Sequence, residues 1–474
     1  MNLLKKIFSP TILTISFLLL LYTFYKSEIY WHGSKREYYL SYYLFSLLLI
    51  FFSIIIFFVS KKIKEYLIIS ITSVMVSLYI FEGYLVFLVK PERKQLIKEQ
   101  NYKKQLIKEQ IYKEQTEKKW DKRSNFEIYK DLKKVNNKIS TFIPTTYLLN
   151  ENFSFFPLSG ISNSETIYCN ENGYYALFQS DRYGFRNPDY EWDKKKIEYL
   201  LVGDSFSHGA CVNKPDDIAS ILRTLSDKSV LNLGYGSKGP LSEYATLREY
   251  LNSKVKKVLW IYYEGNDLED LVREKNSQTL TNYLNDLTFT QNLKFRQNEI
   301  NNLLKNITER EKQSNKKSNK KSKIKKKNLK VKIIELIKIY NIRSLIFTAQ
   351  VSVKSESIAS HQNLLSGFLT SGRTAFEFKK ILELAKELAI KNNSKIYFIY
   401  LPTYNRYTKK FNNVKFNLVK NIITELKIPF IDIHKEVFEK EQNPLKLFPF
   451  ELPLHYNIDG YKKVAETIYK FTKD

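Results

Sequence analysis

The chain has 474 residues, 26% of them charged, and a formal net charge of +27 at pH 7. A charge of this size raises the question of nucleic-acid binding. However, residues 305–332 alone hold 13 Lys and Arg against Glu309 and Glu311, a net of +11, without interleaved aromatic residues. Such a block is typical of a solvated surface loop. The composition therefore argues against nucleic acid as a partner.

Three apolar stretches open the chain, at residues 7–25, 38–60 and 66–89. Each is long enough to cross a hydrocarbon core of ~30 Å as a helix. The first is too long for a signal-peptide core and two more spans follow, so residues 1–90 are predicted to be a transmembrane region in the lipid bilayer. Glu82 lies inside the third span, where a charge is costly, and indicates either a buried polar contact or snorkelling toward the interface.

The charges around the spans favour an orientation. Lysines that favour the cytoplasmic side precede the first span and separate the second from the third: Lys5, Lys6, Lys61, Lys62 and Lys64. Three spans then place the C-terminal part outside the cytoplasm, in the periplasm or at the cell surface. Basic residues in the first outer loop and after Val89 oppose this orientation.

Two segments of different character follow. Residues 91–125 contain a ten-residue repeat, at 94–103 and 104–113, made of strong helix formers, which predicts a charged helical stalk. Residues 126–195 are rich in aromatic residues, Asn, Ser, Gly and Pro. This composition predicts an extension of short strands and turns.

Residues 196–474 are predicted to form one α/β domain. Apolar runs alternate with helical patterns, the clearest helix being residues 374–391, which predicts a three-layer α/β/α arrangement around a parallel sheet of about five strands. The expected strands are residues 197–202, 230–233, 258–263, 395–401 and 429–433. Residues 268–372 are too long for a crossover connection and predict an insertion, a candidate cap near the active edge.

Ser205 is the predicted nucleophile. It follows Gly203 and Asp204 directly behind a buried strand, at the sheet edge where α/β domains carry out chemistry. A serine hydroxyl needs a base that accepts its proton. Taken alone, the Gly-Asp-Ser triplet favours a serine that only caps the next helix.

Two further motifs follow in order: Gly265-Asn266-Asp267 after an apolar run, and His455 before a C-terminal helix. Together with Gly203-Asp204-Ser205 they resemble the SGNH/GDSL hydrolase superfamily. The resemblance implies a flavodoxin-like fold, with Ser205 as nucleophile and His455 as general base. It also implies that the oxyanion is held by the Ser205 backbone, the Asn266 side chain and a backbone N–H at Gly236 or Ser237.

The chain departs from the family pattern near His455. The Asp that normally lies three residues before this His is replaced by Leu452. Glu451 is one residue further away and is the candidate that orients the imidazole; otherwise a Ser-His dyad remains. His434, after another predicted strand, is the rival base.

Cys169 and Cys211 are the chain's two cysteines. An even count in the part predicted to be exported fits one disulfide in an oxidising compartment, and two separate buried thiols are the alternative. Neither cysteine pairs with a histidine at metal-ligand spacing, and no Gly-rich phosphate loop is present, so we expect no metal and no cofactor.

The resemblance and the topology imply a membrane-anchored serine esterase or O-acyltransferase. Its expected substrate is an acyl ester, chiefly acetyl, of a surface glycan, and its expected intermediate is an acyl-serine. The alternative is a catalytically inactive SGNH-like module for glycan binding or assembly, favoured by Leu452 and by the altered sequence around Gly236. A polybasic membrane scaffold is a third class.

Overall fold

The computed structural model describes residues 2–30, 33, 36–149, 153–318, 332–343, 372–408 and 411–473. The chain divides into two compact units. The first unit contains residues 1–97 and 325–348, and the second contains residues 98–324 and 349–474. Each unit is described by itself.

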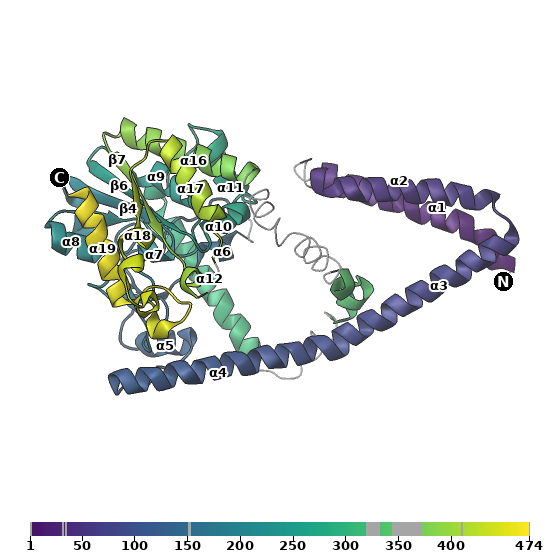
Figure 1. Cartoon of the computed structure of the whole chain (residues 1–474), viewed down its shortest axis with the longest axis horizontal. Coiled ribbons are helices and arrows are strands. Elements are labelled where there is room, and N and C mark those ends of the chain that lie inside the picture. The colour runs from purple at the N-terminus through teal and green to yellow at the C-terminus, as the bar shows by residue number, and fades with distance from the viewer. Residues whose placement is uncertain are drawn as a thin grey trace. The chain divides into compact units, whose positions relative to one another are not determined.

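The first unit is built on long apolar helices: α1 (Asn2–Phe24), α2 (Arg36–Phe58) and α3 (Lys61–Tyr84). Three helical stretches are long and apolar enough to cross a membrane, at Lys6–Tyr30, Tyr39–Phe58 and Lys61–Val89. Helices α1 and α2 lie side by side (Figure 1). The chain is therefore a membrane protein, as predicted.

Glu82 of α3 is fully buried. Its carboxylate accepts hydrogen bonds from the backbone N and the side-chain Nδ2 of Asn341, at 2.9 and 2.8 Å. The backbone N of Ile342 donates a third, at 2.9 Å. The structure thus favours the buried polar contact over snorkelling, with partners from a segment 259 positions away.

A five-stranded parallel sheet forms the core of the second unit, in the order β5-β4-β6-β7-β8. Its strands are β4 (Ile197–Gly203), β5 (Val230–Asn232), β6 (Val255–Tyr263), β7 (Lys395–Leu401) and β8 (Phe430–Asp432). In chain order this is 2-1-3-4-5, the flavodoxin-like order, whose ligands bind at the carboxyl ends of the strands. The predicted α/β fold is confirmed.

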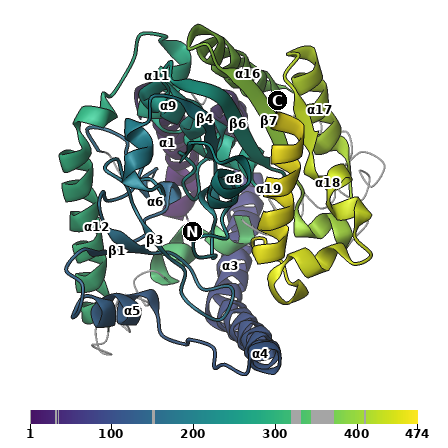
Figure 2. The ribbon, with the colours of Figure 1, turned by 90° about the vertical axis from the view of Figure 1, so that its left-hand side faces the viewer.

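Helices cover both faces of this sheet (Figures 1 and 2). Alternate strand residues point to opposite faces, so Leu200 and Trp260 belong to one core cluster while Leu201 and Leu259 belong to the other. The first cluster is completed by α9 (Pro240–Tyr250), α16 (Arg373–Lys391) and α17 (Val414–Glu425). The second is completed by α8 (Ile218–Ser226) and α19 (Ile458–Thr472).

The extension carries a small sheet of its own, in the order β1-β2-β3. Its elements are α5 (Asn125–Leu132), β1 (Ile139–Thr141), α6 (Thr145–Leu148), β2 (Glu165–Ile167) and β3 (Leu177–Gln179). Strand β1 pairs with β2 in parallel, and β2 pairs with β3 antiparallel. In the preceding stalk segment, α4 spans Lys90–Thr116.

Residues 268–318, the first described part of the insertion, pack into the main core. It forms α10 (Asp267–Glu274), α11 (Gln278–Asn285) and α12 (Gln297–Ser318). Leu271, Tyr283 and Leu304, one from each helix, are buried in the same cluster as α9. Residues 319–331 and 344–371 lie outside the described residues, and the first of these ranges holds seven of the 13 Lys and Arg of residues 305–332.

Candidate active site

Ser205 begins the short helix α7 (Ser205–His208) at the carboxyl end of β4. The turn depends on Gly203, whose φ of 155° and whose tight contact with the backbone of Ile261 leave no room for a side chain. Asp204 caps α7 by accepting a hydrogen bond from the backbone N of Phe206 at 2.8 Å. The strand and its cap therefore present the Ser205 hydroxyl at the sheet edge.

His455 lies on the loop before α19, which Asn457 caps by accepting from the backbone N of Gly460. Its Nε2 is 2.8 Å from the Oγ of Ser205. The hydroxyl also lies 3.3 Å from a carboxylate oxygen of Asp204, a longer contact. The structure thus brings Ser205 and His455 together at hydrogen-bonding distance.

The carboxylate beside His455 is Glu171, from the extension. Its two oxygens lie 3.1 and 3.0 Å from Nδ1 of His455. The backbone N of His455 donates to the same carboxylate at 2.8 Å. A carboxylate on Nδ1 leaves Nε2 unprotonated and facing Ser205, the tautomer that a general base needs.

Glu451, the candidate from the sequence, is therefore not the carboxylate that contacts His455. Its side chain accepts instead from Nδ2 of Asn443 at 3.3 Å, and its carbonyl accepts from the Tyr404 hydroxyl. Glu451 ends a short turn in the left-handed region, with φ of 54°. Proximity in sequence does not bring this side chain to the imidazole.

Ion pairing shifts the pKa values of this pair in opposite directions. Burial lowers the pKa of His455. The charge and hydrogen bond of Glu171, together with the charge of Asp204, raise it by more than burial lowers it, so the pKa of His455 is above its ordinary 6.5. Burial raises the pKa of Glu171, but the charge and hydrogen bonds of His455 outweigh this and leave it below 4.5. Glu171 is therefore ionised wherever His455 is neutral.

The other two histidines among the described residues of the domain, His434 and His208, lie in different surroundings. His434 contacts the Tyr407 hydroxyl through Nδ1 at 2.9 Å and Glu439 through Nε2 at 3.1 Å. His208 is fully buried among aromatic rings, and both its ring nitrogens lack a hydrogen-bond partner among the described residues. Burial, with the charges of nearby cations, holds the pKa of His208 well below its ordinary value, so it is a neutral core residue.

Asn266 precedes α10 and lines the same pocket as Ser205. Its Nδ2 donates to Asp270 at 2.7 Å. An Asn amide has two N–H donors, so Asp270 orients the group while leaving the second donor for a ligand.

Gly236 and Ser237 are not among the residues that line this pocket. A Cβ at Gly236 would lie 2.6 Å from the Tyr168 hydroxyl and 2.7 Å from the Phe142 ring, which makes glycine a packing requirement. Ser237 has a left-handed φ of 66°, and its carbonyl accepts from Thr145 at 2.5 Å.

The pocket over Ser205 has a volume of about 340 Å³. Its wall is made by side chains from the ends of β4, β6 and β7 and from the His455 loop. They include Tyr263, Thr403, Tyr404, Asn405 and Leu454. The described residues of the insertion do not line this pocket, so the cap expected there is not found among them.

The extension also contacts the segment that directly follows α7 and the nucleophile. Cys169 and Cys211 are joined by a disulfide, with Cα atoms 5.1 Å apart. Arg186 donates to the carbonyls of Gly209 and Val212, at 2.6 and 3.0 Å, on the segment that follows α7. In the sequence, Cys169 is two residues from Glu171, and Cys211 is six residues from Ser205.

The donors that a metal would need are already engaged here. Glu171, Cys211 and His455 place one ligand-type atom each within 4.8 Å of one another. The Cys211 sulfur is bonded to Cys169 and is not a thiolate. His455 contacts Ser205 and Glu171 through its two nitrogens. The donor set does not fit a resident metal.

Glu171 is the residue that sequence reasoning missed. It lies in an Asn-rich turn, Asn170-Glu171-Asn172, which carries no catalytic signature. The usable signal was the cysteine pair, because a bond between Cys169 and Cys211 would carry position 171 to the vicinity of Ser205.

Comparisons with known proteins add little to this geometry. No protein-family model matches the chain, and no curated protein matches it. Among solved structures, it is similar to a "putative lipolytic protein of G-D-S-L family" from Desulfitobacterium hafniense DCB-2. The identity is 13%, the match covers 58% of this chain and 99% of that chain, and the TM-score is 0.32. A likeness at this level carries no argument, so the class of protein rests on the strand order and the site.

Proposed function

We propose that the chain is a membrane-anchored serine esterase or O-acyltransferase that acts on acyl esters, chiefly acetyl, of a surface glycan. The observation that carries the proposal is the continuous contact from Ser205 Oγ through His455 to the Glu171 carboxylate. This is the arrangement of a nucleophile, a base and a group that orients the base.

The first half-reaction transfers the acyl group to the enzyme. Ser205 Oγ attacks the ester carbonyl carbon while its proton passes to Nε2 of His455. The negative charge of Glu171 stabilises the imidazolium that forms. When the C–O bond breaks, His455 returns the proton to the departing sugar oxygen and an acyl-serine remains.

The tetrahedral intermediate needs hydrogen-bond donors placed in advance. The proposed donors are the backbone N–H of Ser205 at the start of α7 and the second N–H of Asn266, because both residues line the pocket. The resemblance implied a third donor at Gly236 or Ser237. Neither residue lines the pocket over Ser205, so the proposal counts two donors.

In the second half-reaction, His455 takes a proton from water or from a sugar hydroxyl, whose oxygen then attacks the acyl carbon. The bond from the acyl carbon to Ser205 Oγ breaks, and His455 returns the proton to Ser205 Oγ. With water as the acyl acceptor the reaction is ester hydrolysis, and with a sugar hydroxyl as the acceptor it is acyl transfer. Tyr404, Asn405 and Thr403 on the pocket wall offer an aromatic face and polar groups suited to a saccharide.

The location belongs to the same proposal. The lysines beside the first and second spans support an exported domain. The disulfide beside the site supports an oxidising compartment, either periplasmic or at the cell surface.

Catalysis is favoured over the inactive SGNH-like module by Glu171. The module was supported chiefly by the missing carboxylate before His455, and a carboxylate from another segment occupies the equivalent role. A binding module has no requirement for a base at 2.8 Å from a serine hydroxyl.

A fluorophosphonate probe tests the proposal on the full-length chain in detergent. The activated serine displaces fluoride and forms a stable Ser–O–P adduct, which mass spectrometry of peptides locates. We expect the adduct on Ser205 and its loss in His455→Ala. An unlabelled wild-type chain, or equal labelling after His455→Ala, would refute an activated nucleophile.

A further inference from the structure

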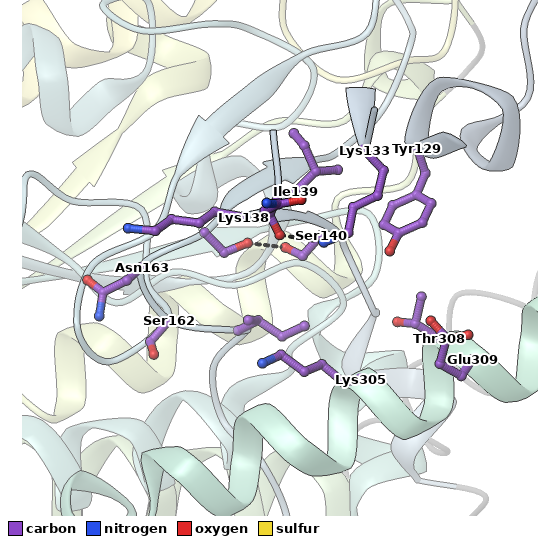
Figure 3. A pocket seen from close by; sticks show the side chains of 13 residues that line it. Tyr129, Lys133, Lys138, Ile139, Ser140, Ser162, Asn163, Lys305, Thr308 and Glu309 are labelled. Atoms are coloured by element: carbon purple, nitrogen blue, oxygen red, sulfur yellow. Dashed lines mark hydrogen bonds between the residues drawn. The ribbon is translucent and has the colours of Figure 1, made fainter. Parts of the chain in front are cut away.

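The second unit contains a cavity of about 490 Å³ that shares no lining residue with the pocket over Ser205. One wall comes from the α5–β1 turn and from β1, and the facing wall comes from α12 (Figure 3). Lys138 and Ser140 lie on the first wall, opposite Lys305 and Thr308 of α12 (Figure 3). This volume falls within the range of small-ligand sites.

The charge of the lining is positive. Lys133, Lys138 and Lys305 contribute three positive groups against the single negative charge of Glu309. Lys133 donates to the carbonyl of Asn137. Within the described part of the chain, Lys138 and Lys305 form no ion pair. Their ammonium groups therefore favour an anionic ligand.

The interior is lined by hydroxyl groups. Ser140, Ser164 and Thr308 are each more than nine-tenths buried. The hydroxyls of Ser140 and Ser164 lie 2.5 Å apart. Tyr129 adds an aromatic ring to the lining, and Ile139 adds an apolar surface. Clustered hydroxyls with one aromatic ring suit the hydroxyls and C–H face of a sugar ring better than an apolar ligand.

The walls are held in place before any ligand arrives. Asn301 of α12 accepts from the backbone N of Ser162 and donates to its side chain, both at 2.9 Å. Thr141 at the end of β1 lies 3.5 Å from Thr308, hydroxyl to hydroxyl. These contacts join the extension to α12, so binding would need little rearrangement.

We infer that this cavity binds an acidic saccharide, a sugar ring that bears a carboxylate, as part of a glycan chain. Lys138 and Lys305 pair with the carboxylate. The buried hydroxyls already bond to one another and to the carbonyl of Leu304, and their remaining lone pairs accept hydrogen bonds from the ring hydroxyls. The inference deepens the proposed function by naming a substrate class. It rests on different residues, so either statement can fail without the other.

The test measures binding to the full-length chain in detergent, with Ser205→Ala to prevent turnover. Isothermal titration compares hexagalacturonate with the neutral maltohexaose and with inorganic phosphate. The cavity variant is Lys138→Gln with Lys305→Gln. The matched control is Lys256→Gln with Lys462→Gln, two exposed lysines elsewhere on the same domain, with the same loss of charge.

We expect hexagalacturonate to bind more tightly than maltohexaose, and the cavity variant to weaken it by about tenfold or more. The control should change its Kd less than about twofold. Absence of hexagalacturonate binding, equal losses in the two double variants, or displacement by phosphate at equal concentration would each overturn the inference.

A second variant guards against a folding defect. Thr308→Val removes one buried hydroxyl at constant shape and should weaken binding about fivefold, the effect of one neutral hydrogen bond. An unchanged Kd with this variant would also count against a sugar in the interior. Fluorophosphonate labelling of the cavity variants with Ser205 restored reports separately on the catalytic site.

Discussion

His455 contacts the carboxylate of Glu171 through two separate donors, although the residues are 284 positions apart in the sequence. The ring Nδ1 lies at 3.0 Å and the backbone N at 2.8 Å. The backbone contact fixes the carboxylate even when the ring rotates. The pair therefore sets both the position of Glu171 and the tautomer of His455.

Glu171→Gln should lower kcat for a short acyl ester by about a hundredfold to ten-thousandfold. The amide keeps the shape but loses the charge that stabilises the imidazolium. Steady-state hydrolysis of an aryl acetate measures the effect. Glu451→Gln is the matched control and should change kcat less than about twofold; the opposite ranking would return the role to Glu451.

Ser205→Ala and His455→Ala should each abolish acyl-ester turnover, and the double variant should fall no further. A nucleophile and its base act as one unit, so the second loss removes nothing more. The measurement is kcat/KM of the three variants against the uncatalysed rate. If Ser205→Ala keeps wild-type hydrolysis while His434→Ala abolishes it, the site is misassigned.

The pH dependence of kcat/KM should show an acid limb with a midpoint above 6.5, the ordinary pKa of histidine. His455 accepts the Ser205 proton in its neutral form, so activity is lost as the pH falls through its raised pKa. Glu171→Gln should move the midpoint to lower pH, because the attraction that raises the pKa is removed. A limb unmoved by this variant would show that another group titrates.

Replacing both Cys169 and Cys211 by Ser should destabilise the second unit by about 4 kcal/mol in the chain-entropy model, given the separation of 42 residues. Chemical denaturation of the full-length chain monitors this loss. We also expect a lower kcat, because Glu171 lies two residues from the lost crosslink. Reductant should have the same effects on wild type and none on the double variant.

Asn266→Ala should leave a residual rate reduced by about a hundredfold or more, the usual cost of one oxyanion donor. The loss should fall on kcat rather than KM, since the donor acts on charge that develops in the transition state. A change confined to KM would assign Asn266 to ground-state binding.

Much of the sheet could be predicted because its central strands are continuous apolar runs. Strand β6 nevertheless begins at Val255, three residues before the predicted start. Lys257 is buried within it because its ammonium lies 3.0 Å from Glu198 and donates to the carbonyl of Thr472 at 2.6 Å. A buried lysine with partners far away in sequence is not visible in a local pattern.

The candidate site likewise contains residues that a local sequence pattern predicts and residues that depend on distant contacts. Ser205, Asn266 and His455 each follow or precede a recognisable element, so their neighbourhoods could be predicted. Glu171 could not, because its role depends on the tertiary packing of a turn that has no regular structure. Gly236 shows the converse. Its local sequence suggested an oxyanion donor, but it does not line the pocket over Ser205, and the close packing of Tyr168 and Phe142 explains why a residue without a side chain is needed there.

The position of Glu171 ahead of the first core strand determines where the functional module begins. A fragment cut at Ile197 would keep every strand of the five-stranded sheet, together with Ser205 and His455, yet it would lack the acidic partner and the arginine behind the nucleophile turn. Under the proposed function, we therefore expect the sheet domain to be inactive when it is grafted alone onto another anchor. Fusions and chimaeras must carry the extension with it.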